Sequence, residues 1–168
     1  LDNVAVANQA THYIRELKPA RVFVDAGGVG GGVVDILYDR GFKKIVRSVM
    51  FGGKALNDDR YHNRRAEMWD NIRAWLSDEP PAQLPQDEVL FNELTCLNKK
   101  YDHKGRLRLE EKDEVKKRLG CSPDMADALA LTFAEPVYDW GEPQLYRKGK
   151  ISIEEIFQSE QRRRNQTW

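Results

Sequence analysis

Several classes of protein are excluded by what this sequence lacks. No apolar run approaches the roughly 18 uncharged residues that a membrane-spanning helix needs. No charged, then apolar, then small-residue leader is present, so the sequence predicts no secretory signal. Its two cysteines form no Cys-x-x-Cys pair, and its three histidines do not have the spacing of a zinc site. A reducing, cytoplasmic setting is therefore expected.

Net charge is absent as well, because 27 Lys and Arg residues balance 27 Asp and Glu residues. Such a chain has no global attraction for nucleic acid, so any binding of that kind must come from a local patch. The length of 168 residues predicts one domain with a substantial core. We expect this domain to span residues 1–135 and a polar C-terminal extension to span 136–168. Because the first residue is Leu1 rather than Met, we expect a fragment or a processed piece.

Hydrophobic periodicity predicts helices that alternate with strands, as in a parallel α/β sheet. The first half should contain a helix over 3–17, a strand over 21–25, a helix from about 33 to 40, a strand over 44–49 and a helix over 63–78. The second half should contain a short helix over 88–97, a hairpin over 99–109, a charged helix over 112–119 and a buried helix over 124–134, with Ser122 as its N-cap. In the extension, Ile153, Ile156 and Phe157 are expected to dock a short helix.

A glycine cluster between residues 27 and 32 follows the first strand. It does not fit the dinucleotide fingerprint, because Val33 stands where the third glycine would be needed. A phosphate-binding P-loop is also excluded, since Gly53-Lys54 is followed by Ala55 rather than Ser or Thr. The cluster therefore predicts either a tight strand-to-helix turn or a loop held close to a substrate or metal.

Three aspartates are candidates for chemistry. Asp25 closes an apolar strand at its carboxyl end, where sites of open α/β sheets assemble, although it could equally cap the turn. Asp127 is the only charge in the apolar run over residues 125–131, so it must be paired, protonated or bound to a cation. Asp124 lies three residues earlier on the same helix, where an acid also favours the helix dipole. Convergent carboxylates without His or Cys partners select Mg²⁺ or Mn²⁺.

A basic stretch over residues 99–118 carries nine basic and five acidic residues. In a chain of zero net charge, this stretch is where a phosphate backbone would lie, while a charged, solvated helix is the alternative. The candidate DNA contacts within it are Lys104, Arg106, Lys112, Lys116 and Lys117.

Taken together, these features resemble the nuclease domain of the large terminase subunit of tailed bacteriophages and prophages. The resemblance covers residues 20–134. It rests on the order and spacing of VFVDAGGVGGGVVD (22–35), NRRAEMW (63–69), GRLRLE (105–110), a Lys-rich helix and SPDMADAL (122–129). It implies that residues 1–135 form an α/β nuclease domain with an RNase H-like mixed sheet flanked by helices.

The resemblance also implies a function, namely cleavage of concatemeric double-stranded phage DNA by an endonuclease that uses two divalent ions. By position, Asp25 matches the acid that ends the second catalytic strand, Asp127 the acid on the closing helix, and Asp124 an auxiliary polar position. All three are therefore expected to be catalytic and to bind Mg²⁺ or Mn²⁺. The implied partners are double-stranded DNA, the terminase ATPase domain, the small terminase subunit and the portal protein, in the cytoplasm of a bacterial host and without a membrane.

The sequence departs from this family in one respect. The first catalytic Asp of the family lies in an N-terminal hairpin that precedes the first helix, whereas here Asp2 stands at the cap of that helix. The hairpin strands and their carboxylate are therefore expected to be missing, and the fragment is expected to be inactive alone. Two alternatives stay open: another RNase H-like nuclease of the resolvase or transposase type, and an inactive DNA-binding or assembly module.

Overall fold

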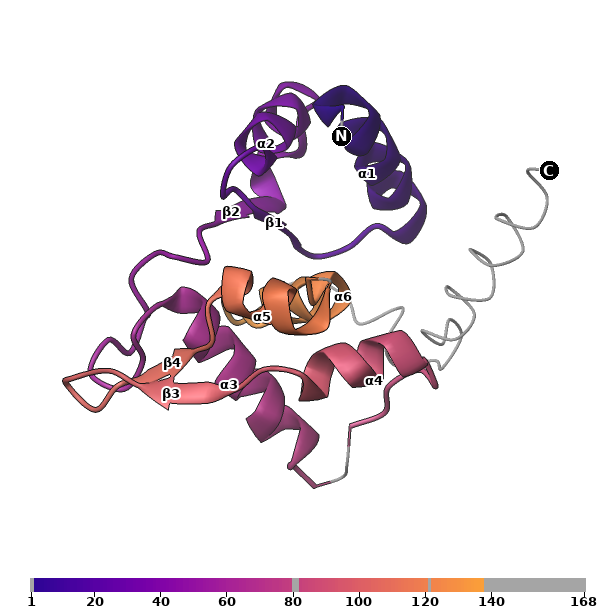
Figure 1. The fold of residues 1–168 in the computed structure, drawn as a ribbon. Coiled ribbons are helices and arrows are strands. Elements are labelled where there is room, and N and C mark those ends of the chain that lie inside the picture. The colour runs from indigo at the N-terminus through magenta and orange to yellow at the C-terminus, as the bar shows by residue number, and fades with distance from the viewer. Residues whose placement is uncertain (1, 80–81, 121, 138–168) are drawn as a thin grey trace.

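The computed structural model describes residues 2–79, 82–120 and 122–137, and its elements follow the predicted order (Figure 1). The first half contains α1 (Asn3–Leu17), β1 (Val22–Asp25), α2 (Gly30–Asp39), the 3-10 helix η1 (Phe42–Lys44), β2 (Val46–Val49) and α3 (Arg64–Leu76). The second half contains α4 (Glu88–Thr95), β3 (Lys99–Tyr101), β4 (Leu107–Leu109), α5 (Lys112–Leu119) and α6 (Asp124–Leu131). The expected docking of Ile153, Ile156 and Phe157 lies outside the described residues.

Strands β1 and β2 pair in parallel, as predicted, with Val22 opposite Val46. Successive side chains of a strand point to opposite faces. Accordingly, Val22 and Val24 pack with α1 and α2, whereas Phe23 packs with the core residues of α6. In Figure 1, α1 and α2 lie on one side of this pair and α6 on the other. Asp25 lies two residues after Phe23, so its side chain points to the same face of the strand, toward α6.

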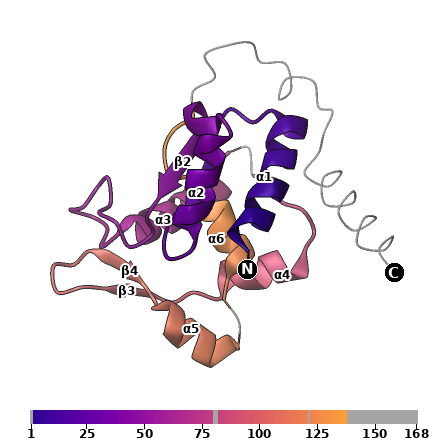
Figure 2. The ribbon, with the colours of Figure 1, turned by 90° about the horizontal axis from the view of Figure 1, so that it is seen from above.

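The expected single mixed sheet is not present in the described part of the chain. Strands β1 and β2 form one two-stranded sheet, and the antiparallel β3–β4 hairpin forms another. Seen from above, α1 and α2 lie together and the hairpin extends beyond them (Figure 2). A larger core cluster fills the space between α3, α4 and α6, with Met68, Ile72 and Ala126 almost fully buried. The structure is thus mixed α/β, with helices around two small sheets.

Several sequence-based boundaries and faces are corrected by the structure. Helix α6 ends at Leu131, because the next residues turn back through i to i−3 hydrogen bonds, and its N-cap residue is Pro123 rather than Ser122. It is buried on one face only, since Ala128 is exposed. The apolar periodicity of residues 3–17 predicts Val4 on the buried side of α1, but Val4 is 51% exposed. At that helix N-terminus, Asp2 accepts a hydrogen bond from the Val4 amide, as its cap position predicted.

Backbone hydrogen bonds join the β3–β4 hairpin to the loop before α3. The His62 amide donates to the Leu107 carbonyl at 2.8 Å, and the Leu107 amide donates to the Arg60 carbonyl at the same distance. At the hairpin turn, burial by itself would raise the pKa of Asp102. Hydrogen bonds from Arg106 and His62 outweigh that effect and hold the pKa well below its usual range. This cluster fixes the base of the hairpin against the loop.

The glycine-rich turn after β1 is tighter than the sequence indicated, because α2 begins at Gly30 rather than near Val33. Gly28 has a φ of +64°, which favours glycine. A Cβ atom at Gly30 would lie 1.8 Å from the backbone oxygen of Asp25, while one at Gly31 would meet the Ala26 oxygen at an ordinary 3.8 Å. The first turn of α2 therefore packs directly on the carboxyl end of β1.

Substituting Gly30 by Ala should destabilise the protein by about 3 kcal/mol or more, because the clash is with backbone and no side chain can move to relieve it. Gly31→Ala is the matched control. It should be neutral or stabilise by about 0.5–1 kcal/mol, since alanine favours a helix. Urea unfolding of both variants measures the difference, and equal stabilities would contradict the packing of α2 on β1.

Candidate metal and nucleic-acid site

Asp25 lies at the carboxyl end of β1, half-buried. Its Oδ1 accepts a hydrogen bond from the Gly27 amide at 3.0 Å, so the carboxylate does cap the turn. That bond uses one oxygen, and Oδ2 has no hydrogen-bond or ion-pair partner among the described residues. Asp25 is thus held by its own turn on the face of the strand that α6 covers.

Asp127 is buried on α6 and is surrounded by donors from other helices. The Arg65 guanidinium donates to both carboxylate oxygens, from Nε to Oδ1 at 3.0 Å and from Nη2 to Oδ2 at 3.3 Å. The Trp69 indole donates to Oδ1 at 2.8 Å, and the Lys112 ammonium lies 3.4 Å from Oδ2. Two cations therefore neutralise a carboxylate that is only 5% exposed. Of the three fates predicted for this residue, the structure shows pairing.

Asp124, one turn earlier on α6, is exposed, so the two aspartates have different environments despite their spacing. In the described ranges, no three His, Cys, Asp or Glu side chains form a group that could hold a metal ion. Asp25 and Asp127 lie on elements that contact each other, since α6 packs on β1. The metal-binding and catalytic roles of Asp25, Asp127 and Asp124 stay predictions.

Much of the basic stretch is paired within the protein. Arg106 binds Asp102, Lys100 binds Glu114, Arg118 binds Glu110, and Arg108 contacts Glu111. Hydrogen bonding from Arg118 lowers the pKa of Glu110 despite its burial. Lys112 binds Asp127, as described above. The remaining cations, Lys99, Lys104, Lys116 and Lys117, are exposed and form no ion pair with any residue that the structure describes.

The predicted DNA contacts therefore divide into two groups. Lys104 on the hairpin turn and Lys116 and Lys117 on α5 present their charges to solvent. Arg106 and Lys112 instead hold Asp102 and Asp127, and the Lys112 ammonium also lies 5.0 Å from the centre of the Phe51 ring. Binding of DNA by any of the five stays a prediction.

Sequence reasoning missed the partners of Asp127. Arg65 and Trp69 stand in the NRRAEMW motif, but the motif by itself predicts no contact of either residue with Asp127. Their spacing of four residues carries the signal, because it places a guanidinium and an indole donor on one helix face. On that face the Arg65 guanidinium also lies 5.7 Å from the centre of the Trp69 ring, which is a cation–π contact. Glu67, also missed, accepts from the amides of Leu56 and Asn57 and so anchors the preceding loop.

The structure is similar to the nuclease domain of the large terminase subunit gp2 of bacterial virus Sf6. The match has a TM-score of 0.61 and 24% identity, and it covers 77% of this chain and 71% of that one. A lysine-to-alanine variant of that domain solved with manganese gives 0.62 and 24%, over 77% and 72%. A variant from bacteriophage Sf6 solved with calcium gives 0.60 and 25%, over 77% and 71%. The predicted resemblance is confirmed at the level of fold.

No protein-family model and no curated protein sequence matches the chain. In the part of the chain that the structure describes, no helix has the length and apolarity needed to cross a membrane.

Proposed function

We propose that this chain is a nuclease domain that hydrolyses double-stranded DNA with divalent metal ions, as part of a phage DNA-packaging terminase. The observation that carries the proposal is the fold shared with a terminase nuclease domain, together with two carboxylates on facing elements of that fold. Asp25 ends β1, and Asp127 lies on α6, which packs on the same strand. The solved structures of that domain with manganese and calcium support the use of divalent ions.

The carboxylate oxygens of Asp25 and Asp127 suit such an ion, although no three acidic, His or Cys side chains come together among the described residues. Oxygen ligands are those that Mg²⁺ and Mn²⁺ prefer. Asp25 has an oxygen outside its turn, and Asp127 has Oδ2, which Arg65 and Lys112 share. The Lys112 side chain is 49% exposed, so it has room to move away from Asp127. A bound ion would neutralise charge on a phosphate and activate water.

The residues of the chain divide the remaining work. Asp25 and Asp127 hold the ion, and Asp124 contributes at the rim. Arg65 and Trp69 fix the orientation of the Asp127 carboxylate through the hydrogen bonds described above. Lys104, Lys116 and Lys117 bind phosphates of the duplex, while Arg106 and Lys112 reach it after leaving their acidic partners. The packaging ATPase, the small terminase subunit and the portal are the partners that this function would need, in the host cytoplasm.

Cleavage of plasmid DNA tests the proposal. The 168 residues alone should cut little or not at all, since Asp25 and Asp127 supply few of the anionic ligands that two ions need. A chain extended upstream through the hairpin strands should cut in Mn²⁺ or Mg²⁺ and stop cutting in EDTA. An extended chain that binds DNA without cutting it would instead support the inactive DNA-binding module.

Binding of DNA should depend on the exposed lysines of α5. Lys116→Ala with Lys117→Ala should weaken binding of any duplex sequence and reduce the salt dependence by about 0.9 counterions per lost phosphate contact. Lys43→Ala with Lys44→Ala removes the same charge from the exposed residues of η1 and serves as the control. Fluorescence anisotropy over a salt series measures both, and equal slopes for the two variants would place the DNA elsewhere.

A further inference from the structure

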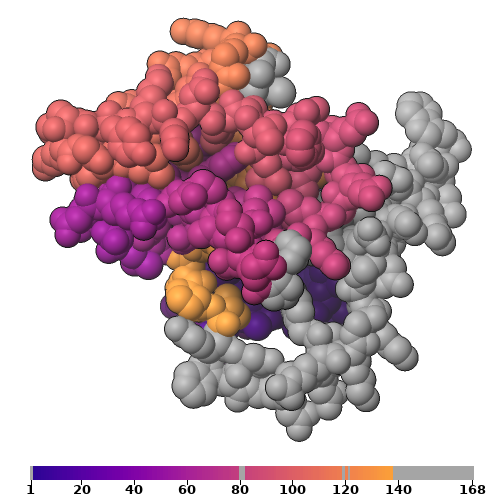
Figure 3. Space-filling view, turned by 90° about the horizontal axis from the view of Figure 1, so that it is seen from below, coloured from indigo at the N-terminus to yellow at the C-terminus, as the bar shows by residue number. Residues whose placement is uncertain are grey.

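A groove of about 1280 Å³ lies between α3, α4 and the β3–β4 hairpin. Its floor is apolar and includes Trp69, Ile72 and Leu76 from α3 and Leu94 and Leu97 from the α4 side. Figure 3 shows this face of the molecule, with α3 along one side and α4 and the hairpin along the other. Leu76 is 38% exposed and Tyr101 is 64% exposed. Trp69 and Ile72 are themselves buried core residues, so the apolar surface open to an occupant comes mainly from Leu76 and Tyr101. Exposed apolar side chains gathered in a groove are typical of a binding site.

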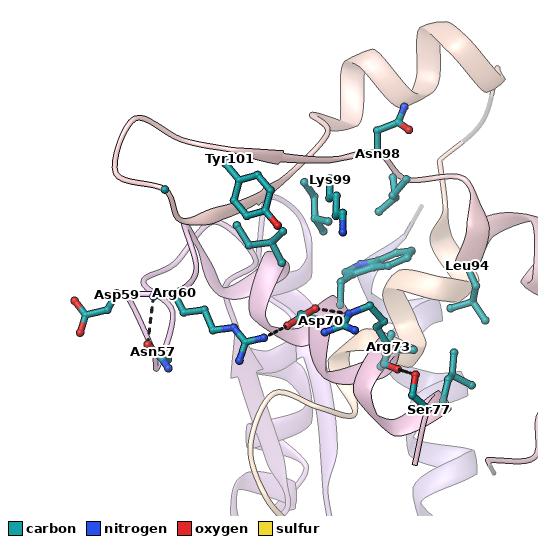
Figure 4. A pocket seen from close by; sticks show the side chains of 17 residues that line it. Asn57, Asp59, Arg60, Asp70, Arg73, Ser77, Leu94, Asn98, Lys99 and Tyr101 are labelled. Carbon is teal, nitrogen blue, oxygen red and sulfur yellow. Dashed lines mark hydrogen bonds and ion pairs between the residues drawn. The ribbon is translucent and has the colours of Figure 1, made fainter. Parts of the chain in front are cut away.

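The rim of the groove is basic. Arg60 and Arg73 come from opposite sides of Asp70, which binds both of them (Figure 4). Asp70 also accepts a hydrogen bond from Tyr61. Burial and that hydrogen bond raise the pKa of Tyr61 to about 12. Lys99 adds a charge from the hairpin, and Asp59 is the other acid of the lining. Because Asp70 is already shared by two arginines, the charge left for an occupant is positive.

The described chain ends near α3, the helix that forms one wall of this groove. Phe133, just past α6, contacts Trp75 with ring centroids 5.6 Å apart, and Trp75 precedes the groove residue Leu76. In Figure 3 the end of the described chain lies next to α3. The sequence continues past Val137 to Trp168. Residues 138–150 could span about 45 Å if fully extended, which is ample for a later segment to return to the groove.

That later sequence contains a segment with matching chemistry. Ile153, Ile156 and Phe157 have the i, i+3, i+4 spacing of helix-in-groove ligands, and Glu154 and Glu155 stand between them. We propose that residues 151–157 of the same chain bind in this groove, with their apolar side chains on the floor and their acids toward Arg60, Arg73 and Lys99. A tether of this length gives an effective concentration on the order of millimolar, so modest contacts suffice.

Hydrogen–deuterium exchange of the full 168-residue chain tests this proposal. Ile156→Asp with Phe157→Asp should speed exchange within 151–157 by about tenfold or more, since a segment docked 90% of the time is protected to that degree. Exchange should also rise in the groove segments 72–77 and 94–101. Gln158→Asp with Ser159→Asp is the matched control, because it adds the same charge next to the segment and removes no apolar side chain.

A charge exchange gives a second readout that does not depend on the apolar variant. Lys99→Glu should weaken protection of 151–157, and adding Glu155→Lys to it should restore protection. The proposal is overturned if 151–157 exchanges in the parent as fast as in the double Asp variant. It is also overturned if protection of the groove is unchanged in the tail variants and instead rises with protein concentration, which would identify a second copy as the occupant. Protection of the groove that is seen only with added DNA would likewise overturn it.

Discussion

Replacing Asp127 by Ala is expected to lower the free energy of unfolding by about 3–5 kcal/mol, because it leaves the Arg65 guanidinium buried without its carboxylate. The side chains of Arg65 and Asp127 are each 7% exposed, so water cannot replace the lost partner. For a domain of this size the melting temperature should fall by roughly 10 °C or more. If Asp127 lay among repelling carboxylates of an empty metal site, as the sequence suggests, its removal would leave the stability of the protein unchanged or increase it. The observed ion pair reverses that expectation.

The control for this experiment is Asp124→Ala on the same helix. Its side chain is exposed, so the loss should stay within about 1 kcal/mol, the value of a favourable helix-dipole charge. A joint replacement, Arg65→Met with Asp127→Leu, should recover most of the stability because no buried charge remains unpaired. Urea unfolding measures all four proteins. Equal losses for Asp127→Ala and Asp124→Ala would show that Asp127 is not held as the structure has it.

Replacing Asp25 by Asn is expected to reduce metal-dependent DNA cleavage by the upstream-extended chain about a hundredfold or more, since a metal ligand contributes several kcal/mol to the transition state. Stability should barely change. The turn uses one oxygen of Asp25 as an acceptor for the Gly27 amide, and an asparagine oxygen can replace it. Asp25→Asn therefore separates catalysis from folding more cleanly than any change at Asp127.

Asp35→Asn provides the matched control for the cleavage experiment. Asp35 lies on α2, shortly after the same glycine turn, and is exposed, so its loss should leave cleavage within about twofold if it contacts neither ion nor DNA. Initial rates of plasmid nicking at several Mn²⁺ concentrations measure the effect. Cleavage that survives Asp25→Asn would remove this residue from the site and, with it, the proposed mechanism.

The local elements of this protein could be predicted from the sequence. Capping residues, helical periodicity and the glycine at the hairpin turn act over a few neighbours, so α1, α3, α5 and the hairpin appear close to their expected places. The parallel pairing of β1 and β2 also followed, because a helix connects two apolar strands. The resemblance to a terminase nuclease was readable for the same reason: its residues keep their order along the chain.

The contacts that those residues make depend on the packing of distant segments and could not be predicted from the sequence. The start of α2 at Gly30 depends on how closely its first turn approaches the Asp25 carbonyl, which no spacing rule encodes. The sequence allows Asp127 to be paired, protonated or metal-bound. It is paired because the fold places Arg65, 62 positions away in the sequence, beside it. Likewise, the net charge of residues 99–118 concealed that most of its cations bind acids inside the fold. Burial and ion pairing arise from contacts between distant segments, so a charge pattern along the chain cannot determine them.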